Sequence, residues 1–200
     1  MPVTWIPGSG IWSNSYLFGG VLVDCGVLPM QVAPYRERIE EIVLTHCHYD
    51  HTAHIAQIRA MTGAKTAVHR LDAPALGDDL LSSAMLFGEK AAPVTMDRLL
   101  GDGDRVGELA VIHTPGHTPG SICLYHEGEE VLISGDTVFT HGSFGRYDLP
   151  GGDLQALRAS LKKLSGYAVQ GIYPGHGDPV REGGDRHIVA ALQVIGGLHE

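Results

Sequence analysis

The segment of this sequence that most constrains the fold is His46–His51, which reads His-Cys-His-Tyr-Asp-His and places three histidines and one carboxylate in six positions. It follows Glu41–Thr45, a compact apolar segment that is predicted to be a β-strand. Alternate side chains of an extended chain share a face, so His46 and His48 can reach one metal ion together. Cys47 points to the opposite face and is interpreted as a packing residue.

A turn into a helix after this strand would move the next two polar side chains, Asp50 and His51, to a neighbouring position. One loop would then supply ligands for two adjacent metal positions. The alternative interpretation is a solvated polar loop in which the histidines cluster by chance. The pattern in the rest of the chain distinguishes between these two interpretations.

Three later segments share one property, because each follows an apolar strand and lies in a turn rich in glycine or proline. They contain His117 in Thr-Pro-Gly-His-Thr, Asp136 in Ser-Gly-Asp-Thr, and His176 in Pro-Gly-His-Gly. Any one of them alone is weak evidence, since a histidine between glycines is more often a turn residue than a ligand. Four such sites in one small chain favour a metal centre.

The composition indicates one acidic globular domain over residues 1–200, with an ordinary hydrophobic fraction of 44%. The formal net charge of -9 disfavours binding to phosphate backbones, so we expect a small-molecule substrate and no nucleic-acid partner. The three cysteines show no disulfide-framework spacing. Neither a secretory signal nor an apolar run of about 18 residues is visible, so we expect a cytoplasmic protein without a membrane partner.

The predicted elements run from a strand-rich part to a helical part and then repeat that order. The first strands are expected at Val3–Ile6, Ser15–Phe18, Val21–Asp24, Glu41–Thr45 and Lys65–His69, and the later ones at Leu109–His113, Ser121–His126, Glu130–Ser134 and Gly171–Tyr173. The helices are expected at Pro29–Glu40, Thr52–Met61, Asp153–Ser165 and Arg186–Ile195. This order suits two packed sheets with helices on the outside.

The ordered set His-x-His-x-Asp-His, Gly-His, Gly-Asp and Gly-His-Gly resembles the metallo-β-lactamase superfamily through most of the chain. Asn14–Leu17 followed by Leu22–Gly26 resembles the first hairpin of that superfamily. The resemblance implies an α+β fold, an αββα sandwich of two mixed β-sheets flanked by helices, with metal ions at one edge. Within the superfamily, the sequence is most similar to the glyoxalase II-like branch of hydroxyacylglutathione hydrolase-like enzymes.

The resemblance implies a site for two divalent metal ions, with zinc as the expected metal and iron or manganese as alternatives. The first ion would be held by His46, His48 and His117, the second by Asp50, His51 and His176, and Asp136 would bridge both. A hydroxide between the metals would attack an acyl carbonyl, with Asp50 as the catalytic residue that orients it. The implied function is hydrolysis of a small ester or thioester.

Other functions stay open at this stage. The main alternative is a persulfide dioxygenase with one non-haem iron held by His46, His117 and Asp136. A lactonase, a nuclease of the same superfamily and a non-enzymatic binding scaffold are further alternatives. Glyoxalase II enzymes carry an additional C-terminal helical segment that helps to bind glutathione, and we expect none here after His176. The sequence does not indicate an oligomeric state.

Residues near the predicted ligands suggest additional roles. Arg146 is a candidate for binding a substrate carboxylate, and the alternative is a structural ion pair with Asp148 or Asp153. Tyr173 is a second candidate substrate-binding residue, because it lies beside the motif of His176. Asp24 either orients a ligand histidine or caps a turn. Residues 71–98 have no clear pattern and are interpreted as a short helix and a loop over the site.

Overall fold

The strands of the first half of the chain form a six-stranded mixed sheet, in a computed structural model that describes residues 2–198. Its order is β1-β2-β3-β4-β5-β6, antiparallel from β1 to β3 and parallel from β3 to β6. The strands are β1 (Thr4–Ile6), β2 (Ser15–Phe18), β3 (Val21–Val23), β4 (Glu41–Val43), β5 (Lys65–His69) and β6 (Arg98–Leu100).

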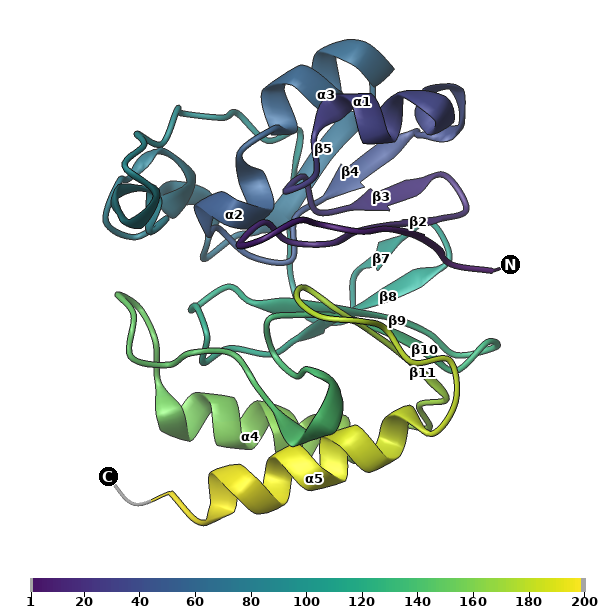
Figure 1. Cartoon of the computed structure of the whole chain (residues 1–200), viewed down its shortest axis with the longest axis vertical. Coiled ribbons are helices and arrows are strands. Elements are labelled where there is room, and N and C mark those ends of the chain that lie inside the picture. Colours follow the sequence, from purple (N-terminus) through teal and green to yellow (C-terminus); the bar gives the residue numbers. More distant parts are fainter. Residues whose placement is uncertain (1, 199–200) are drawn as a thin grey trace.

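The central strands β2 and β3 are fully buried, and most of β4 and β5 is buried as well, in agreement with their largely apolar sequences. In β4, Ile42 packs toward the helices α1 (Pro29–Val32) and α3 (Ile55–Thr62). Its neighbour Val43 packs against the second sheet. The short helix α2 (Tyr49–Thr52) follows the end of β4 and lies at the edge of the sheet that is on the left of Figure 1.

The second sheet has five strands in the order β11-β10-β9-β8-β7 and is also mixed, because only β10 and β11 are parallel. The strands are β7 (Arg105–Val106), β8 (Leu109–His113), β9 (Ile122–His126), β10 (Val131–Gly135) and β11 (Gly171–Pro174). In β10, Ile133 points between the sheets and Leu132 points toward the helices α4 (Leu154–Leu164) and α5 (Gly184–Gly196).

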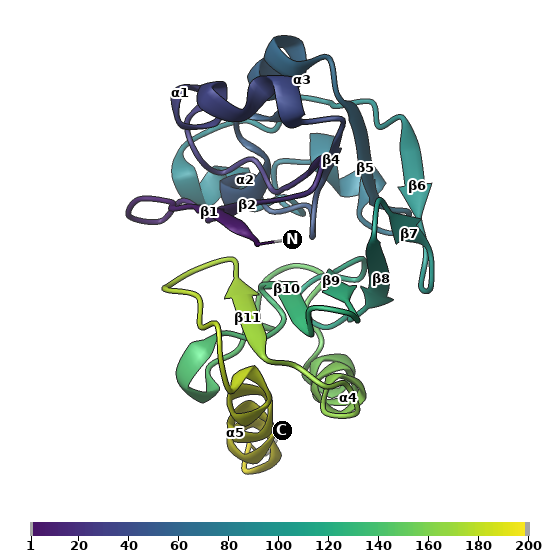
Figure 2. The ribbon, with the colours of Figure 1, turned by 90° about the vertical axis from the view of Figure 1, so that its right-hand side faces the viewer.

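The layers are therefore helix, sheet, sheet and helix, as Figures 1 and 2 show. This arrangement confirms the predicted fold of two mixed β-sheets flanked by helices. Residues 1, 199 and 200 lie outside the described part of the predicted domain. Within residues 2–198, no helix combines the length and the apolar character that a membrane crossing requires.

Two predicted helices are divided in the structure. Instead of one helix over Pro29–Glu40, α1 gives way to a 3₁₀ helix at Ala33–Arg38, because Pro34 has no N–H to continue the α-helical hydrogen bonds. Instead of one helix from residue 52, the chain forms α2 and then α3, and Gly63 ends α3 in the left-handed conformation. The segment after β5 contains 3₁₀ helices at Ala73–Gly77 and Ala84–Phe87.

The buried carboxylate of Asp72, just after β5, joins two loops at this edge. Its Oδ2 accepts hydrogen bonds from the backbone N of Cys47 at 2.9 Å and from Oγ1 of Thr118 at 2.7 Å. Its Oδ1 accepts from the backbone N of Gly120 at 2.6 Å. Burial raises the pKa of Asp72, although these hydrogen bonds oppose that shift. One carboxylate thus ties the loop after β4 to the loop after β8.

We expect Asp72→Asn to lower the free energy of unfolding by about 1–3 kcal/mol, because one accepting oxygen becomes a donor that faces N–H and O–H donors. Asp97→Asn is the matched control, since Asp97 also accepts from a backbone N and a hydroxyl, both of Thr66, but on the surface. Denaturant unfolding of both variants measures the difference. Equal losses would contradict a special role for the buried carboxylate.

Candidate metal centre

The seven predicted ligands lie on loops that leave strands at one edge of the sandwich. His46 and His48 follow β4, and Asp50 and His51 lie in α2. The other three follow strands of the second sheet, and they are His117 after β8, Asp136 after β10 and His176 after β11. The two sheets therefore each contribute ligands, and the structure brings all seven together. Their role as metal ligands stays a prediction.

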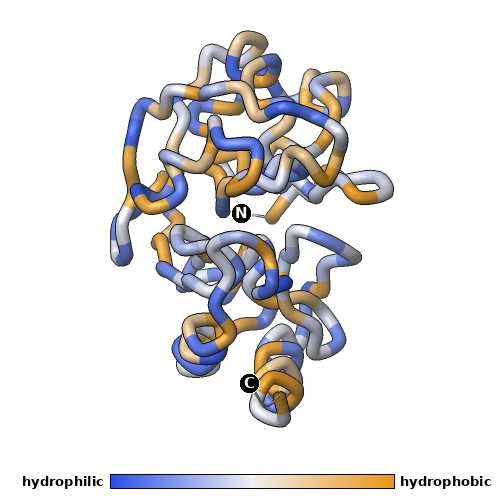
Figure 3. The backbone as a smooth tube through the Cα atoms, turned by 90° about the vertical axis from the view of Figure 1, so that its left-hand side faces the viewer, coloured by the Kyte–Doolittle hydropathy of each residue, from blue (hydrophilic) through white to orange (hydrophobic). Residues whose placement is uncertain are grey.

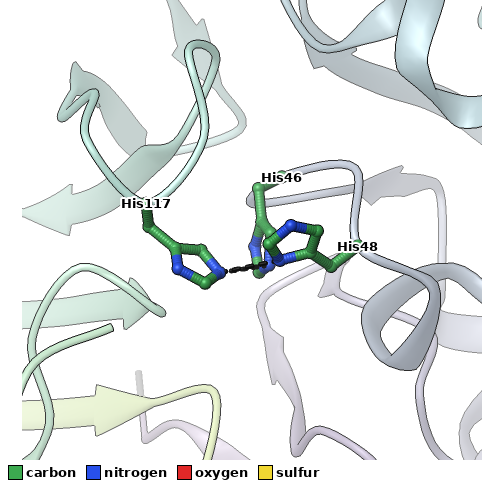
Figure 4. A group of neighbouring side chains, drawn as sticks. All are labelled: His46, His48 and His117. Atoms are coloured by element: carbon green, nitrogen blue, oxygen red, sulfur yellow. Dashed lines mark hydrogen bonds between the residues drawn. The ribbon is translucent and has the colours of Figure 1, made fainter. Parts of the chain in front are cut away.

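The first group is formed by His46, His48 and His117, whose side chains point toward one another in Figure 4. His48 Nδ1 lies 2.8 Å from His117 Nε2, which lies 3.2 Å from His46 Nε2. All three side chains are buried. Cys47 points away from them into the core beneath the outer helices, in agreement with its interpretation as a packing residue.

The second group is formed by Asp50, His51 and His176. His176 Nε2 lies 3.0 Å from Asp50 Oδ2 and 3.3 Å from His51 Nε2. Asp50 and His51 are consecutive residues in the first turn of α2, and His51 Nε2 lies 3.7 Å from Asp50 Oδ2. The predicted turn into a helix after His48 therefore brings Asp50 and His51 to the predicted ligand His176.

Asp136 lies between the two groups. Its Oδ1 is 3.2 Å from His51 Nε2, and its Oδ2 is 3.6 Å from His117 Nε2 and 3.5 Å from His176 Nε2. Asp136 Oδ1 and His48 Nε2 are buried atoms for which the described residues supply no hydrogen-bond partner. A carboxylate that contacts histidines of both groups is suited to the predicted bridging position.

Hydrogen bonds on the other side of each ring fix the tautomers of three histidines. His117 Nδ1 lies 2.6 Å from the carbonyl oxygen of Arg146, which can only accept, so this Nδ1 carries the proton. His51 Nδ1 donates in the same way to Asp24 Oδ2 at 2.8 Å. In their neutral forms, these two rings present unprotonated Nε2 atoms to the centre.

The tautomer of His46 follows from a chain of two hydrogen bonds. The hydroxyl of Thr45 donates to Asp24 Oδ2 at 2.8 Å, so its oxygen accepts from His46 Nδ1 at 3.0 Å. The Nε2 lone pairs of His46 and His117 then face each other across 3.2 Å. Lone pairs at this distance repel, and a cation between them removes the repulsion.

The pKa shifts of His46, His48 and Asp136 favour the form that binds metal. Burial, and then the neighbouring His51, hold the pKa of His46 well below its usual value. Burial and then His117 lower the pKa of His48 to about 3. Burial opposes ionisation of Asp136, but His51 and His176 outweigh it and hold its pKa far below the usual range. Neutral imidazoles and an ionised carboxylate fit divalent metal ions.

His51 behaves differently from the histidines of the first group. Burial disfavours its charged form, but Asp136, Asp24 and Asp50 outweigh burial and raise the pKa of His51 well above its usual value. In Asp50, burial likewise opposes ionisation, and the nearby His51 and His176 lower its pKa. The second group thus concentrates negative charge, which a divalent cation neutralises.

Asp24 forms a hydrogen bond with His51, one of the predicted ligands, and this contact favours the first of the two roles considered for it. It lies at the end of β3 with a φ of 61°, a left-handed conformation that is uncommon for residues other than glycine. Its Oδ1 accepts from the backbone N of Thr45 at 2.7 Å, and its Oδ2 contacts Thr45 Oγ1 and His51 Nδ1. Backbone strain of this kind is characteristic of functional sites.

The two predicted substrate-binding side chains are not directed into the centre. The guanidinium of Arg146 is exposed and forms two hydrogen bonds of 2.8 Å with Asp148, while its backbone carbonyl holds His117. Asp153, the other partner considered, caps α4 by accepting from Ala156. The ring of Tyr173 packs between the sheets, 5.5 Å from that of Tyr16. A substrate role for Tyr173 would require a route into this core.

Sequence reasoning missed three contributors to the site, and they are Thr45, Asp72 and the carbonyl of Arg146. Thr45 stands directly before His46, so its position could have suggested a hydrogen bond to that ring. Asp72 lies in the segment without a clear pattern, and only the fold brings it to the loops after β4 and β8. A main-chain carbonyl leaves no signal in the residue types.

Known proteins and solved structures similar to this chain include the following three. A protein of Methanocaldococcus jannaschii named a probable metallo-hydrolase is 36% identical over 191 residues, which cover 86% of this chain and 90% of that protein. A hydroxyacylglutathione hydrolase of Polaromonas sp. is 35% identical over 147 residues, covering 70% of this chain but 49% of that enzyme. The solved structure of TTHA1623 in a di-iron-bound form is 31% identical and covers 93% of this chain and 94% of its own, with a TM-score of 0.78.

The family profile described as the metallo-beta-lactamase superfamily matches residues 13–176. This range contains Asp24, all seven predicted ligands and the strands that position them. The similarity to a probable metallo-hydrolase extends over most of both chains. The chain therefore belongs to the metallo-β-lactamase superfamily and is a metallo-hydrolase of that fold.

Proposed function

We propose that this protein hydrolyses a small-molecule ester or thioester with two divalent metal ions. The observation that carries the proposal is the completeness of both ligand groups, which share Asp136 between them. His46, His48 and His117 would hold one ion, and the members of the second group would hold the other. Zinc is the expected metal, with iron and manganese as alternatives, and the di-iron form of TTHA1623 supports a pair of ions.

Metal ions bound here would lower the pKa of a water molecule and polarise the acyl carbonyl, which is the chemistry that they supply. The chain's own residues position the reactants. Asp50, with Oδ2 at the centre, is assigned to orient the attacking water through a hydrogen bond. Asp24 and the Arg146 carbonyl keep the histidine rings from rotating. In the reaction, water oxygen bonds to the acyl carbon, the carbon–sulfur or carbon–oxygen bond breaks, and the leaving group takes a proton.

The relative named hydroxyacylglutathione hydrolase supports thioesters as candidate substrates. The match spans about half of that enzyme, so its substrate is not transferred to this chain. A persulfide dioxygenase would need one iron held by His46, His117 and Asp136. The complete second group of Asp50, His51 and His176 favours the two-metal hydrolase instead.

We expect wild-type protein to contain two metal ions per chain and to hydrolyse thioesters. Asp136→Ala and His48→Ala should each lower kcat/KM by about a hundredfold or more, since even a residue behind the ligands commonly contributes 10–100-fold. Elemental analysis of protein purified without chelators measures the metal. His141→Asn is the control, because His141 is an exposed histidine outside both groups.

One iron per chain, together with oxygen uptake in the presence of a persulfide, would contradict the hydrolase and support the dioxygenase. Full metal content and full activity in both alanine variants would show that these residues are not ligands.

We expect Asp24→Asn to weaken metal binding at both positions by about 10–100-fold, because an uncharged amide holds the His51 ring and the Thr45 hydroxyl less firmly. Asparagine tolerates the left-handed backbone, so the turn is kept. Competition with a chromogenic chelator measures the affinity, and Asp153→Asn at the start of α4 is the control. A fall in melting temperature with unchanged metal affinity would show that Asp24 is only structural.

A further inference from the structure

Several large apolar side chains are exposed in the segments that adjoin the loop of the predicted ligands. Leu80, Leu81, Met85 and Leu86 belong to the segment after β5, and their exposed fractions lie between 38% and 64%. Ile11, in the loop before β2, is 62% exposed. Large apolar side chains that gather on a surface mark a binding site more often than scattered ones do.

Three aromatic rings form the base of this surface. The rings of Trp12 and Phe87 are stacked, with centroids 5.6 Å apart and an interplanar angle of 25°. Tyr49 lies 5.8 Å from Phe87 and 6.1 Å from Trp12. All three are only partly buried, so their contacts with one another leave ring surface open to solvent. The rings come from three separate segments and hold the surface in place.

The surface is joined directly to the loop that carries the metal ligands. The backbone N of Tyr49 donates to the carbonyl of Ser82 at 2.8 Å, and Tyr49 lies between His48 and Asp50 in the sequence. The Sγ of Cys47 donates to the carbonyl of Leu81 at 3.6 Å. Figure 1 shows the segment after β5 beside α2, and Figure 3 looks onto this edge, where hydrophobic stretches lie on the loops around it.

We propose that Ile11, Leu80, Leu81, Met85, Leu86 and Phe87, here called the apolar rim, bind the apolar acyl or aromatic part of the substrate. The proposal rests on the proposed function and narrows it to esters and thioesters with a bulky apolar acyl group. We assign the rim to the substrate because it is hydrogen-bonded to the loop of the predicted ligands. The carbonyls of Leu81 and Ser82 accept hydrogen bonds from the two residues on either side of His48. A group held on the rim would lie beside the loop that carries His48 and Asp50.

Burial of each methylene group on such a surface should raise kcat/KM by about two- to fourfold. We therefore expect metal-loaded wild-type protein to hydrolyse N-acetylcysteamine thioesters increasingly well from acetyl to octanoyl. In the double variant Met85→Gln/Leu86→Gln, the octanoyl-to-acetyl ratio of kcat/KM should fall by about tenfold. Both substituted side chains are exposed, so the core is untouched.

The matched control is the double variant Val189→Gln/Val194→Gln. These two apolar side chains of α5 are exposed to a similar degree, 47% and 53%, but lie in the opposite helical layer. This control should keep the wild-type ratio. An equal fall in both double variants would attribute the effect to general surface polarity and overturn the proposal.

A binding measurement tests the rim without catalysis. The chain has two tryptophans, Trp5 and Trp12, and only Trp12 contacts the rim through Phe87. The S-octyl thioether of N-acetylcysteamine, which cannot be hydrolysed, should change the tryptophan fluorescence of the wild-type protein and of Trp5→Phe. Trp12→Phe should lose this change.

The two measurements separate the two proposals. Octyl thioether binding at Trp12 without hydrolysis of any thioester would support the rim and contradict the proposed function. Thioester hydrolysis that is independent of acyl length, with no fluorescence change, would keep the proposed function and overturn the rim. A Met85→Gln/Leu86→Gln variant that changes only sedimentation or vesicle binding would assign this surface to a second copy or to lipid and would also overturn it.

Discussion

The arrangement of the site depends on the hydrogen bonds that the carboxylate of Asp24 accepts. It receives hydrogen bonds from the backbone and hydroxyl of Thr45 and from the Nδ1 of His51. Because the Thr45 hydroxyl in turn accepts from His46, one carboxylate fixes the tautomers of a histidine in each ligand group. The left-handed backbone conformation of Asp24 places its carboxylate where it can form these hydrogen bonds. This conformation costs free energy, and the pairing of β3 with β4 holds it in place.

These hydrogen bonds require rigid strand ends that meet at one edge, and the sandwich of two sheets provides them. Strands β3 and β4 are parallel neighbours, so Asp24 after one lies beside Thr45 after the other. The second sheet delivers His117, Asp136 and His176 from three further strand ends. Asp72 then ties the loops of the two sheets together through Cys47, Thr118 and Gly120. Ligands on loops are thereby held with the precision of the strands beneath them.

Residue types and spacing predicted the sandwich and the seven residues that converge, because ligands follow apolar strands and the motifs are local. What they could not predict depends on contacts between distant segments. The hydrogen bond from His117 to the Arg146 carbonyl involves the main chain, so no side chain marks it. Tyr173 stands beside the His176 motif in sequence, but its ring points between the sheets, since successive side chains of a strand alternate. Residues 71–98 lack periodicity because short 3₁₀ helices and loops have none, and all of the apolar rim except Ile11 lies within them.

The two ligand groups act as one electrostatic unit. The first group contains three buried histidines with no carboxylate of its own, and its negative charge comes from Asp136. The second group contains Asp50. It shares Asp24 and Asp136 with the first group, because Asp24 links the groups through hydrogen bonds and Asp136 links them through close contacts. A cation at either position would face Asp136, because this carboxylate lies close to His51 and His176 of the second group and to His117 of the first. The electrostatic link between the two groups therefore runs through Asp136, the carboxylate that both groups contact.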